Sequence, residues 1–197
     1  ITMFKNPGLV SHGEVAIPKN PQAVAQRLKL HSLMFITGKK DSRRLAPAMN
    51  DYILFFRKPG DGRPVPGLYD DKQNPGGWFT QEDWIKWARG CWDDILEIDT
   101  LDGWRCAKES QEEKHVCPLQ LEPVRRCVLL YTAPGDTVLE PFGGIGTVPY
   151  ICVEQGRRCT AFELKESYYR MMCANVKKAQ HEAAGKGQAD LPLSEVN

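Results

Sequence analysis

A glycine-rich turn, Glu140-Pro-Phe-Gly-Gly-Ile-Gly-Thr147, constrains the fold of this chain more than any other stretch. An apolar run precedes it, and Thr147 and Pro149 suit the N-cap and first turn of a helix. The pattern predicts a strand, a tight turn and a helix, in which glycines let the backbone approach a ligand closely. No Gly-x-x-x-x-Gly-Lys-Ser/Thr occurs, and the third glycine of Gly-x-Gly-x-x-Gly would fall on Pro149. The turn is typical of a nucleotide site, but of neither a P-loop nor an NAD fingerprint.

Glu163 stands at the end of the next expected strand, 17 positions after Gly146. In nucleotide-binding α/β folds, a carboxylate at this place accepts hydrogen bonds from the two ribose hydroxyls. The simpler interpretation is an ordinary glutamate at a strand end. The order of turn, helix, strand and acid favours the ribose role.

Periodicity and turn residues predict the remaining elements. The expected strands are 12–17, 50–58, 136–140 and 158–163, and the expected helices are 22–34, 81–87, 119–131, 147–155 and 166–180. Proline, glycine and aspartate make 59–79 a long loop. The stretch after about residue 182 has little to bury and is expected to fray.

Composition excludes several classes of protein. A length of 197 residues suits one domain with a real core, and a net charge of +1 means that any contact with nucleic acid must come from local patches. The seven cysteines are odd in number and form no Cys-x-x-Cys, which predicts reduced thiols in a cytoplasmic protein rather than a disulfide framework. No apolar run reaches membrane-spanning length and no signal peptide is found, so no membrane partner is expected.

The glycine turn resembles the S-adenosylmethionine loop of the amino-group DNA methyltransferases, written (Asp/Asn/Glu/Ser)-Pro-Phe-x-Gly-x-Gly-(Thr/Ser). Glu113-Lys-His-Val-Cys-Pro-Leu-Gln120 upstream and Gly156-Arg-Arg-Cys-Thr-Ala-Phe-Glu-Leu-Lys-Glu-Ser-Tyr-Tyr169 downstream are similar to the flanking segments of phage and prophage members. The likeness covers about residues 110–178, and a looser one reaches back to about residue 12. It implies an α/β, Rossmann-like methyltransferase fold, S-adenosylmethionine as cofactor and double-stranded DNA as partner.

The resemblance also implies roles for individual residues. Glu140 either accepts a hydrogen bond from the amino group of the cofactor or holds the loop. The turn near Pro118 and the following helix start lie beside the methionine part, where a helix N-terminus favours the carboxylate. The simpler interpretation of the glycines is a tight structural turn. The residues implied at the cofactor are Lys114, His115, Gln120, Glu140, Pro141, Phe142, Gly144, Gly146, Thr147 and Glu163.

Two clusters have both a structural and a functional interpretation. The basic cluster either contacts DNA phosphates or forms a solvated face, and its members are Lys39, Lys40, Arg43 and Arg44. The tryptophan cluster either stacks on bases or forms a small core, which the need for aromatic burial favours; its members are Trp84, Trp87, Trp92 and Trp104. His115 and Cys117 alone are too few ligands for zinc, so no metal is expected and Cys117 is assigned to packing.

The motif that carries out methyl transfer is not found. Transfer to an exocyclic amine requires a flipped base, and the family uses (Asp/Asn/Ser)-Pro-Pro-(Tyr/Phe/Trp) for it, whereas no Pro-Pro occurs in this sequence. The catalytic residues therefore stay unknown. In relatives with the cofactor loop near the C-terminus, this motif and the central strands precede the segment that Ile1 begins. We therefore expect an incomplete sheet, with the central strands outside this chain.

Three explanations are open for such a sheet. The chain is part of a longer protein, which its start at Ile1 favours; or a second chain supplies the missing strands; or it is a degenerate remnant that has repacked. The expected division is 1–58 for outer strands of the methyltransferase sheet, 59–110 for a loop-rich insertion and candidate target-recognition region, 111–181 for the S-adenosylmethionine-binding part and 182–197 for a flexible tail.

The function that the sequence favours is methyl transfer from S-adenosylmethionine to the exocyclic amine of adenine or cytosine in DNA, as in phage or restriction-modification enzymes. An alternative is a non-catalytic module that retains the fold and binds DNA or a partner subunit. A third, a methyltransferase acting on RNA, protein or a small molecule, is disfavoured by the segment from His115 to Gln120. The sequence does not distinguish adenine from cytosine or reveal the recognition site.

Overall fold

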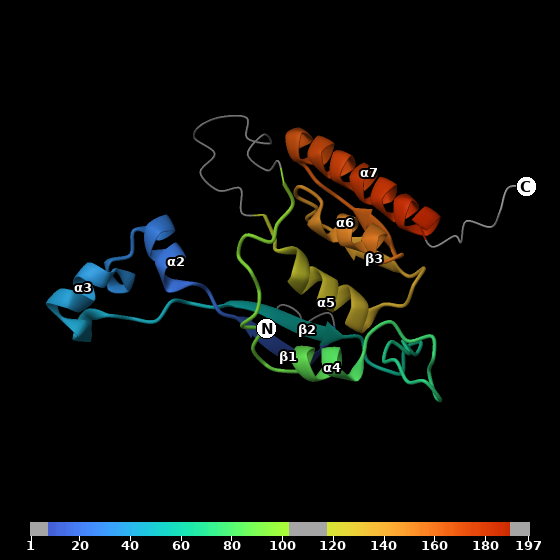
Figure 1. Cartoon of the computed structure of the whole chain (residues 1–197), viewed down its shortest axis with the longest axis horizontal. Helices are drawn as coiled ribbons and strands as arrows, with labels where there is room; N and C mark the ends of the chain where they lie inside the picture. The colour runs from blue at the N-terminus through green and yellow to red at the C-terminus, as the bar shows by residue number, and fades with distance from the viewer. Residues whose placement is uncertain (1–7, 103–117, 190–197) are drawn as a thin grey trace, which may run out of the picture. The chain divides into compact units, whose positions relative to one another are not determined.

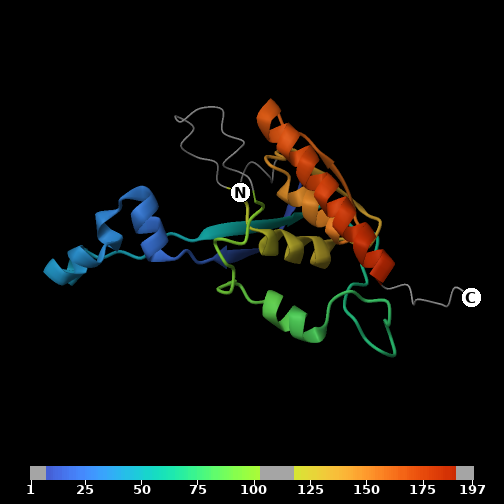
Figure 2. The same cartoon turned by 45° about the horizontal axis from the view of Figure 1, so that its top comes forward.

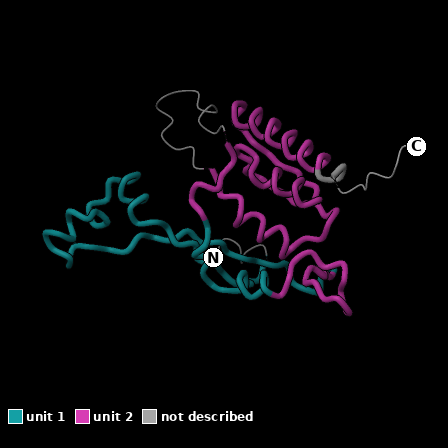
Figure 3. The backbone as a smooth tube through the Cα atoms, viewed as in Figure 1, with its two compact units in different colours: residues 1–63, 82–95 teal, residues 64–81, 96–197 magenta. Residues whose placement is uncertain are grey.

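The computed structural model describes residues 8–102 and 118–189. The chain divides into two compact units, residues 1–63 with 82–95 and residues 64–81 with 96–197 (Figure 3). The expected insertion at 59–110 is thus shared between them, because 82–95 belongs to the first unit and 64–81 to the second. No helix of the described ranges is long and apolar enough to cross a membrane.

In the first unit, β1 (Val10–Ile17) and β2 (Asp51–Arg57) pair as antiparallel strands (Figure 1). Alternation along β1 buries Val15 and Ile17, as the sequence pattern predicts. These are the strands expected at the outer part of a methyltransferase sheet. Among the described residues they form a two-stranded sheet of their own.

Two tryptophans after β2 are buried, as the core interpretation predicts. Trp87, the last residue of α4 (Gln81–Trp87), is 8% exposed, and Trp92 is 1% exposed. The Trp92 indole N–H donates to the Trp87 carbonyl oxygen at 2.9 Å. Trp84 is half-exposed and Trp104 lies outside the described residues, so the expected cluster is confirmed only for the buried pair.

Between β1 and β2 the chain forms a small helical lobe, residues 21–46, which we call the basic lobe (Figures 1 and 2). Its interior holds Val24, Ala25 and Leu33, with Met34 and Ala48 packed against them. Its elements are α2 (Pro21–Leu28), η1 (His31–Leu33), α3 (Phe35–Lys40) and η2 (Ser42–Arg44).

The single helix expected over 22–34 is wrong beyond Leu28. Asn20 caps α2 by accepting a hydrogen bond from the Gln22 N–H at 2.9 Å, and Pro21 occupies the first turn. Lys29 then adopts a left-handed conformation with φ 52°, which ends the helix. The apolar spacing that suggested one helix continues because η1 adds Leu33 to the same small interior.

The second unit contains the expected strand–turn–helix–strand around the glycine turn. β3 (Thr137–Glu140) and β4 (Arg158–Ala161) are parallel, with Thr137 opposite Arg158 and Glu140 opposite Ala161. α6 (Thr147–Glu154) connects them. α5 (Leu121–Tyr131) precedes β3 and α7 (Glu166–Ala189) follows β4.

The helices α5, α6 and α7 of the second unit lie side by side, with α6 between α5 and α7 (Figures 1 and 2). Ile151 and Cys152 of α6 are fully buried at the centre of this packing. α7 continues to Ala189, beyond the expected end at Gln180, and therefore into the segment expected to be a flexible tail. It gains a contact there, because the Tyr150 hydroxyl donates to Glu182 Oε2 at 2.6 Å. The core comprises Leu101, Val124, Val128, Ile145, Tyr150, Ile151, Cys152 and Ala179.

The long loop at 64–81 is anchored to the rest of the second unit. The Trp78 indole N–H donates to the Leu129 carbonyl oxygen at 2.7 Å, and the Arg157 guanidinium lies 5.1 Å from the centre of the Trp78 ring. Arg157 also donates to the Thr132 carbonyl oxygen at 2.9 Å, and burial lowers its pKa. These contacts lie at the end of α5 and the start of β4, so the anchor is at the opposite end of the parallel strands from the glycine turn.

Candidate cofactor site

The glycine turn extends the pairing of β3 and β4 beyond the strands. The Phe162 N–H donates to the Glu140 carbonyl oxygen at 2.9 Å, and the Gly143 N–H donates to the Phe162 carbonyl oxygen at 2.7 Å. The two chain segments that leave the carboxyl ends of the parallel strands are therefore held side by side. In α/β sheets this edge is where ligands bind.

Glu140 holds the turn from within. Its Oε1 accepts a hydrogen bond from the Phe142 N–H at 2.7 Å, closing a loop of two residues over Pro141. Of the two roles considered for Glu140, the structure shows this one. Phe142, whose backbone is fixed in this way, points a side chain that is 86% exposed into solvent.

Glu163 reaches across from the end of β4 to the same turn. Its Oε2 accepts a hydrogen bond from the Gly144 N–H at 2.7 Å, and its Oε1 accepts one from the Lys165 N–H at 2.8 Å. The structure thus brings Glu163 and the turn together, as the expected cofactor site requires. Each carboxylate oxygen carries two lone pairs, so these two bonds leave acceptor capacity for further donors.

The three glycines of the turn are required for different physical reasons. Gly144 has φ 54°, and a Cβ added to it would meet nothing within 4 Å, so it needs glycine for its backbone angle and presents an open side. A Cβ on Gly146, with φ 93°, would lie 2.8 Å from Met172 Cγ. A Cβ on Gly143 would lie 2.7 Å from Met172 Sδ. Gly143 and Gly146 therefore allow α7 to pack against the turn, and Gly144 leaves space in front of it.

Thr147 does not cap α6, contrary to the sequence expectation. Gly146 takes the N-cap position with a left-handed backbone, so that the helix begins at Thr147, one residue earlier than a cap at Thr147 would allow. Thr147 is buried, and its hydroxyl lies 3.4 Å from the Leu119 carbonyl oxygen. On the other side, the Asn175 amide donates to the Ile145 carbonyl oxygen at 2.8 Å. The turn is therefore held from α7 as well as from its own strands.

Gln120 precedes α5 and lies in the second unit near the start of α6, through the Leu119 contact with Thr147. It pairs with Thr100 as an isolated bridge, and the Leu121 N–H donates to the Asp99 carbonyl oxygen at 2.9 Å. Lys114 and His115, which the resemblance places beside the methionine group, lie outside the described residues.

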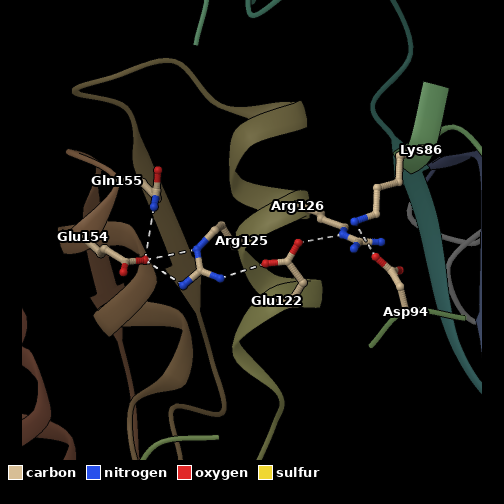
Figure 4. Close-up of polar contacts among 7 residues, drawn as sticks. All are labelled: Lys86, Asp94, Glu122, Arg125, Arg126, Glu154 and Gln155. Atoms are coloured by element: carbon tan, nitrogen blue, oxygen red, sulfur yellow. Dashed lines mark hydrogen bonds and ion pairs between the residues drawn. The ribbon is translucent and has the colours of Figure 1, made fainter. Parts of the chain in front are cut away.

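A network of charges joins α5 to α6 (Figure 4). Glu122 accepts hydrogen bonds from Arg125 at 2.8 Å and from Arg126 at 2.9 Å. Arg125 also donates to Glu154 at 3.1 Å. Burial opposes the charge of Arg125, but its two glutamate partners raise its pKa overall. The network fixes the first half of α5, and with it Gln120, against the helix that begins at the turn.

Two apolar side chains beside the turn, in addition to Phe142, were not identified from the sequence. Leu164, next to Glu163, is completely exposed, and Phe162 is 58% exposed. With Phe142 they place three large apolar side chains next to the residues that hold the turn. The available signal was position, because both Phe162 and Leu164 flank the acid at the end of β4.

The basic cluster lies on the basic lobe in the first unit. Lys39 and Lys40 end α3, and Arg43 and Arg44 belong to η2, all with exposed side chains. Arg43 forms a two-point ion pair with Asp41, at 2.9 Å and 3.0 Å. This contact lowers the pKa of Asp41 and raises that of Arg43.

The described cysteines are not paired with one another; they are Cys91, Cys127, Cys152, Cys159 and Cys173. Within residues 8–102 and 118–189, no group of three or more His, Cys, Asp or Glu side chains is arranged to hold a metal ion. His115 and Cys117 lie outside these ranges.

Comparison with known proteins shows the family of this chain. The model of the N6/N4 DNA methylases matches residues 22–174. The chain is 41% identical over 54 residues to the type II methyltransferase M.Cfr9I of Citrobacter freundii, covering 27% of this chain and 18% of that protein. It is 26% identical over 134 residues to the DNA adenine methyltransferase YhdJ of Escherichia coli, covering 68% of this chain and 41% of that protein.

Among solved structures, the chain is similar to TTHA0409 of Thermus thermophilus, described as a DNA modification methylase and crystallised with S-adenosyl-L-methionine. The TM-score is 0.60 at 22% sequence identity, covering 89% of this chain and 56% of that one. This likeness supports the α/β methyltransferase fold. The chain spans less than half the length of the two sequence relatives. The specific likeness to phage members stays a prediction. The match over residues 22–174 shows that the chain belongs to the N6/N4 DNA methylase family.

Proposed function

We propose that this chain supplies the S-adenosylmethionine-binding part of a DNA methyltransferase that modifies the exocyclic amine of adenine or cytosine. The observation that carries the proposal is the position of Glu163, whose carboxylate joins the end of β4 to the Gly144 N–H. A carboxylate fixed at the carboxyl edge of two parallel strands suits the neighbouring hydroxyls of a ribose.

The other residues of the site fit the remaining parts of the cofactor. The exposed rings and aliphatic groups of Phe142 and Leu164 offer apolar surface to the adenine base. Gln120, with Lys114 and His115, is assigned to the methionine end. The bound cofactor supplies the methyl group, while these residues hold and orient it.

DNA contact is assigned to the basic lobe. Lys39, Lys40, Arg43 and Arg44 carry exposed cations that can neutralise phosphates. Such contacts position the duplex without reading its sequence. The target base and the recognition sequence are left open by this arrangement.

We assign the catalytic motif to polypeptide that this sequence does not include, either a longer form of the protein or a second chain. Two surfaces of the β3–β4 pair support this. Leu139 of β3 is 67% exposed, and a cavity of about 820 Å³ lies between β4 and α7. β3 and β4 pair only with each other among the described residues, and unpaired strand edges are places where further strands add. The alternative is a non-catalytic module that keeps the fold and binds DNA or a partner subunit, which the absent Pro-Pro motif favours.

Calorimetry with S-adenosylmethionine tests the cofactor assignment. We expect binding by the parent chain and an affinity about tenfold or more lower for Glu163→Gln, since a hydrogen bond to a charged group contributes about 1.5–3 kcal/mol. Glu166→Gln is the matched control, because Glu166 is exposed and pairs only with Arg170 in the described contacts. A folded parent that does not bind the cofactor would refute the proposal.

A second measurement separates ribose binding from support of the turn. If Glu163 accepts hydrogen bonds from the ribose, the parent should bind adenosine more tightly than 2′,3′-dideoxyadenosine, and Glu163→Gln should lose most of that preference. A variant that keeps the preference while losing thermal stability would assign Glu163 to holding Gly144 alone. Methylation of DNA by the chain on its own would contradict the assignment of the catalytic motif to other polypeptide.

A further inference from the structure

The basic lobe concentrates positive charge. Residues 21–46 contain six lysines and arginines and one acidic residue, while the whole chain has a net charge of only +1. The rest of the chain is therefore acidic on balance. A local excess of one sign attracts a polyanion even when the protein as a whole does not.

The same lobe also exposes large apolar side chains. Phe35 is 71% exposed and Ile36 is 57% exposed, both at the start of α3. Leu45, just after η2, is 47% exposed. Grouped apolar exposure on a small lobe is a sign of an interaction surface.

Apolar and basic residues share the faces of α3. Residues four apart lie one above the other on a helix, about 6 Å apart along its axis. Phe35 is therefore followed by Lys39 on one face, and Ile36 by Lys40 on the next. Each exposed apolar side chain is thus paired with a cation one turn further along.

A groove continues this surface into the lobe. It has a volume of about 590 Å³ and runs beside α3, lined by Met34, Phe35, Gly38, Lys39 and Leu45 among others. A Cβ on Gly38 would lie 3.1 Å from Leu45 Cδ1. Glycine at this position therefore lets the Leu45 side chain lie close to the backbone of α3. The lining of the groove is mostly apolar and includes Lys39.

We propose that α3 is a DNA wedge: Lys39 and Lys40 hold backbone phosphates while Phe35 and Ile36 press against an opened base step. The inference rests on the proposed function, since removing a base from the stack costs a few kcal/mol that an apolar insertion offsets in part. Phenylalanine and isoleucine are among the side chains that insert between base steps, and lysines beside them suit the flanking phosphates. This charge complementarity selects DNA over an uncharged protein surface as the occupant.

The test uses the full chain and a mixed-sequence duplex of about 30 base pairs, long enough for contacts on both sides of an opened step, with 2-aminopurine in place of several adenines. Emission from this base rises when it leaves the stack. The parent should raise the emission, and Phe35→Ser/Ile36→Ser should lose at least half of that rise while keeping the dependence of affinity on salt. Lys39→Gln/Lys40→Gln should instead reduce the slope of log affinity against log salt by about 2, since each phosphate contact contributes about 0.9.

Matched controls come from other exposed pairs. Leu96→Ser/Ile98→Ser removes two exposed apolar side chains of the second unit, and Lys177→Gln/Lys178→Gln removes two neighbouring lysines of α7. Both should behave as the parent. Phe35→Leu/Ile36→Leu changes the same two positions but keeps apolar bulk, and it should retain most of the emission change. This result would show that the loss in the serine variant comes from lost apolar surface and not from substitution at these positions as such.

Two results would overturn the wedge. One is a parent that binds the duplex without raising emission, and the other is a Phe35→Ser/Ile36→Ser variant that raises it as the parent does. If that variant also loses a binding to vesicles containing one quarter phosphatidylserine that the parent has, the surface is assigned to a membrane. Calorimetry on the same samples separates the proposals: retained S-adenosylmethionine binding leaves the proposed function intact, and its absence refutes that function independently of the wedge.

Discussion

The glycine turn and the basic lobe differ in where their polar and charged groups are directed. The turn directs its polar groups inward: Glu140 and Glu163 bind its backbone N–H groups, and Asn175 binds its Ile145 carbonyl oxygen. The lobe directs its functional groups outward, with exposed lysines and an exposed Phe35 over a very small interior. A small cofactor requires a site held in fixed geometry, whereas phosphates at many positions along a duplex can be met by cations on flexible side chains.

This difference has an energetic consequence. Changes in the turn should alter stability and cofactor binding together, because the same contacts serve both. Changes on the surface of the lobe should alter DNA binding with little effect on stability, since substitutions of exposed side chains usually stay within about 0.5 kcal/mol. Variants of the two regions test this division.

Gly146→Ala should have the largest effect. The left-handed backbone costs an alanine about 1–2 kcal/mol, and its Cβ would lie 2.8 Å from Met172 Cγ and 3.0 Å from Met172 Cα. Because one of these two atoms belongs to the backbone, α7 must move, which adds about 1–3 kcal/mol. We expect a stability loss of about 3 kcal/mol by urea unfolding, together with loss of S-adenosylmethionine binding.

Gly76→Ala is the control for this variant. Gly76 belongs to the second unit, does not adopt a positive φ and has nothing within 4 Å of an added Cβ. It should change stability by less than about 0.5 kcal/mol. A Gly146→Ala protein with parental stability and cofactor affinity would show that α7 does not hold the turn.

Leu33→Ala should have the next largest effect, confined to the basic lobe. Leu33 is 7% exposed and is one of three buried residues in the lobe interior. Removing buried methyl groups there should cost about 2 kcal/mol, at the lower end for such changes because the small core can collapse. Hydrogen exchange should show faster exchange in α2 and α3, with α6 unchanged. Equal loss of protection in α6 would mean that the lobe and the glycine turn unfold together.

The sequence predicts the secondary structure around the glycine turn better than it predicts tertiary contacts. Strand, turn, helix and strand from 136 to 161 follow from local periodicity and from glycines at positive φ, and their expected ends lie close to those of β3, α6 and β4. The left-handed Lys29, which divides the expected 22–34 helix, has no glycine or asparagine to signal it. Hydrogen bonds such as Trp78 to Leu129, 51 residues apart, depend on tertiary packing and leave no local pattern.

The candidate site shows the same limit. The place of Glu163 at a strand end is a sequence-spacing prediction, and the structure brings it to the turn. The assignment of Thr147 as a helix cap failed because Gly146 can start the helix with a backbone angle that no threonine adopts easily. Phe142 was expected at the site, whereas Leu164 was not, because exposure of an apolar side chain is decided by what packs around it and not by its neighbours in sequence.

Asp41→Asn should have the smallest effect on stability, and it should tighten DNA binding. Asp41 holds Arg43 in an exposed two-point ion pair, and exposed pairs contribute little to stability. Since the Arg43 guanidinium keeps the pKa of Asp41 below its usual value, the carboxylate stays charged at neutral pH and competes with phosphate for Arg43. Replacing it with asparagine keeps the acceptor for the Arg43 N–H but releases the guanidinium.

Asp41→Asn should therefore tighten binding to a mixed-sequence duplex and steepen the slope of log affinity against log salt by about 0.9, the value of one phosphate contact. Fluorescence anisotropy over a series of salt concentrations measures both. Asp71→Asn, in the loop at 64–81, removes the same charge elsewhere and should leave the slope unchanged. An unchanged slope for Asp41→Asn would mean that Arg43 does not meet phosphate, and the basic cluster would then include a solvated arginine. A steeper slope with unaltered unfolding would show that the lobe, unlike the turn, gains binding without altering the fold.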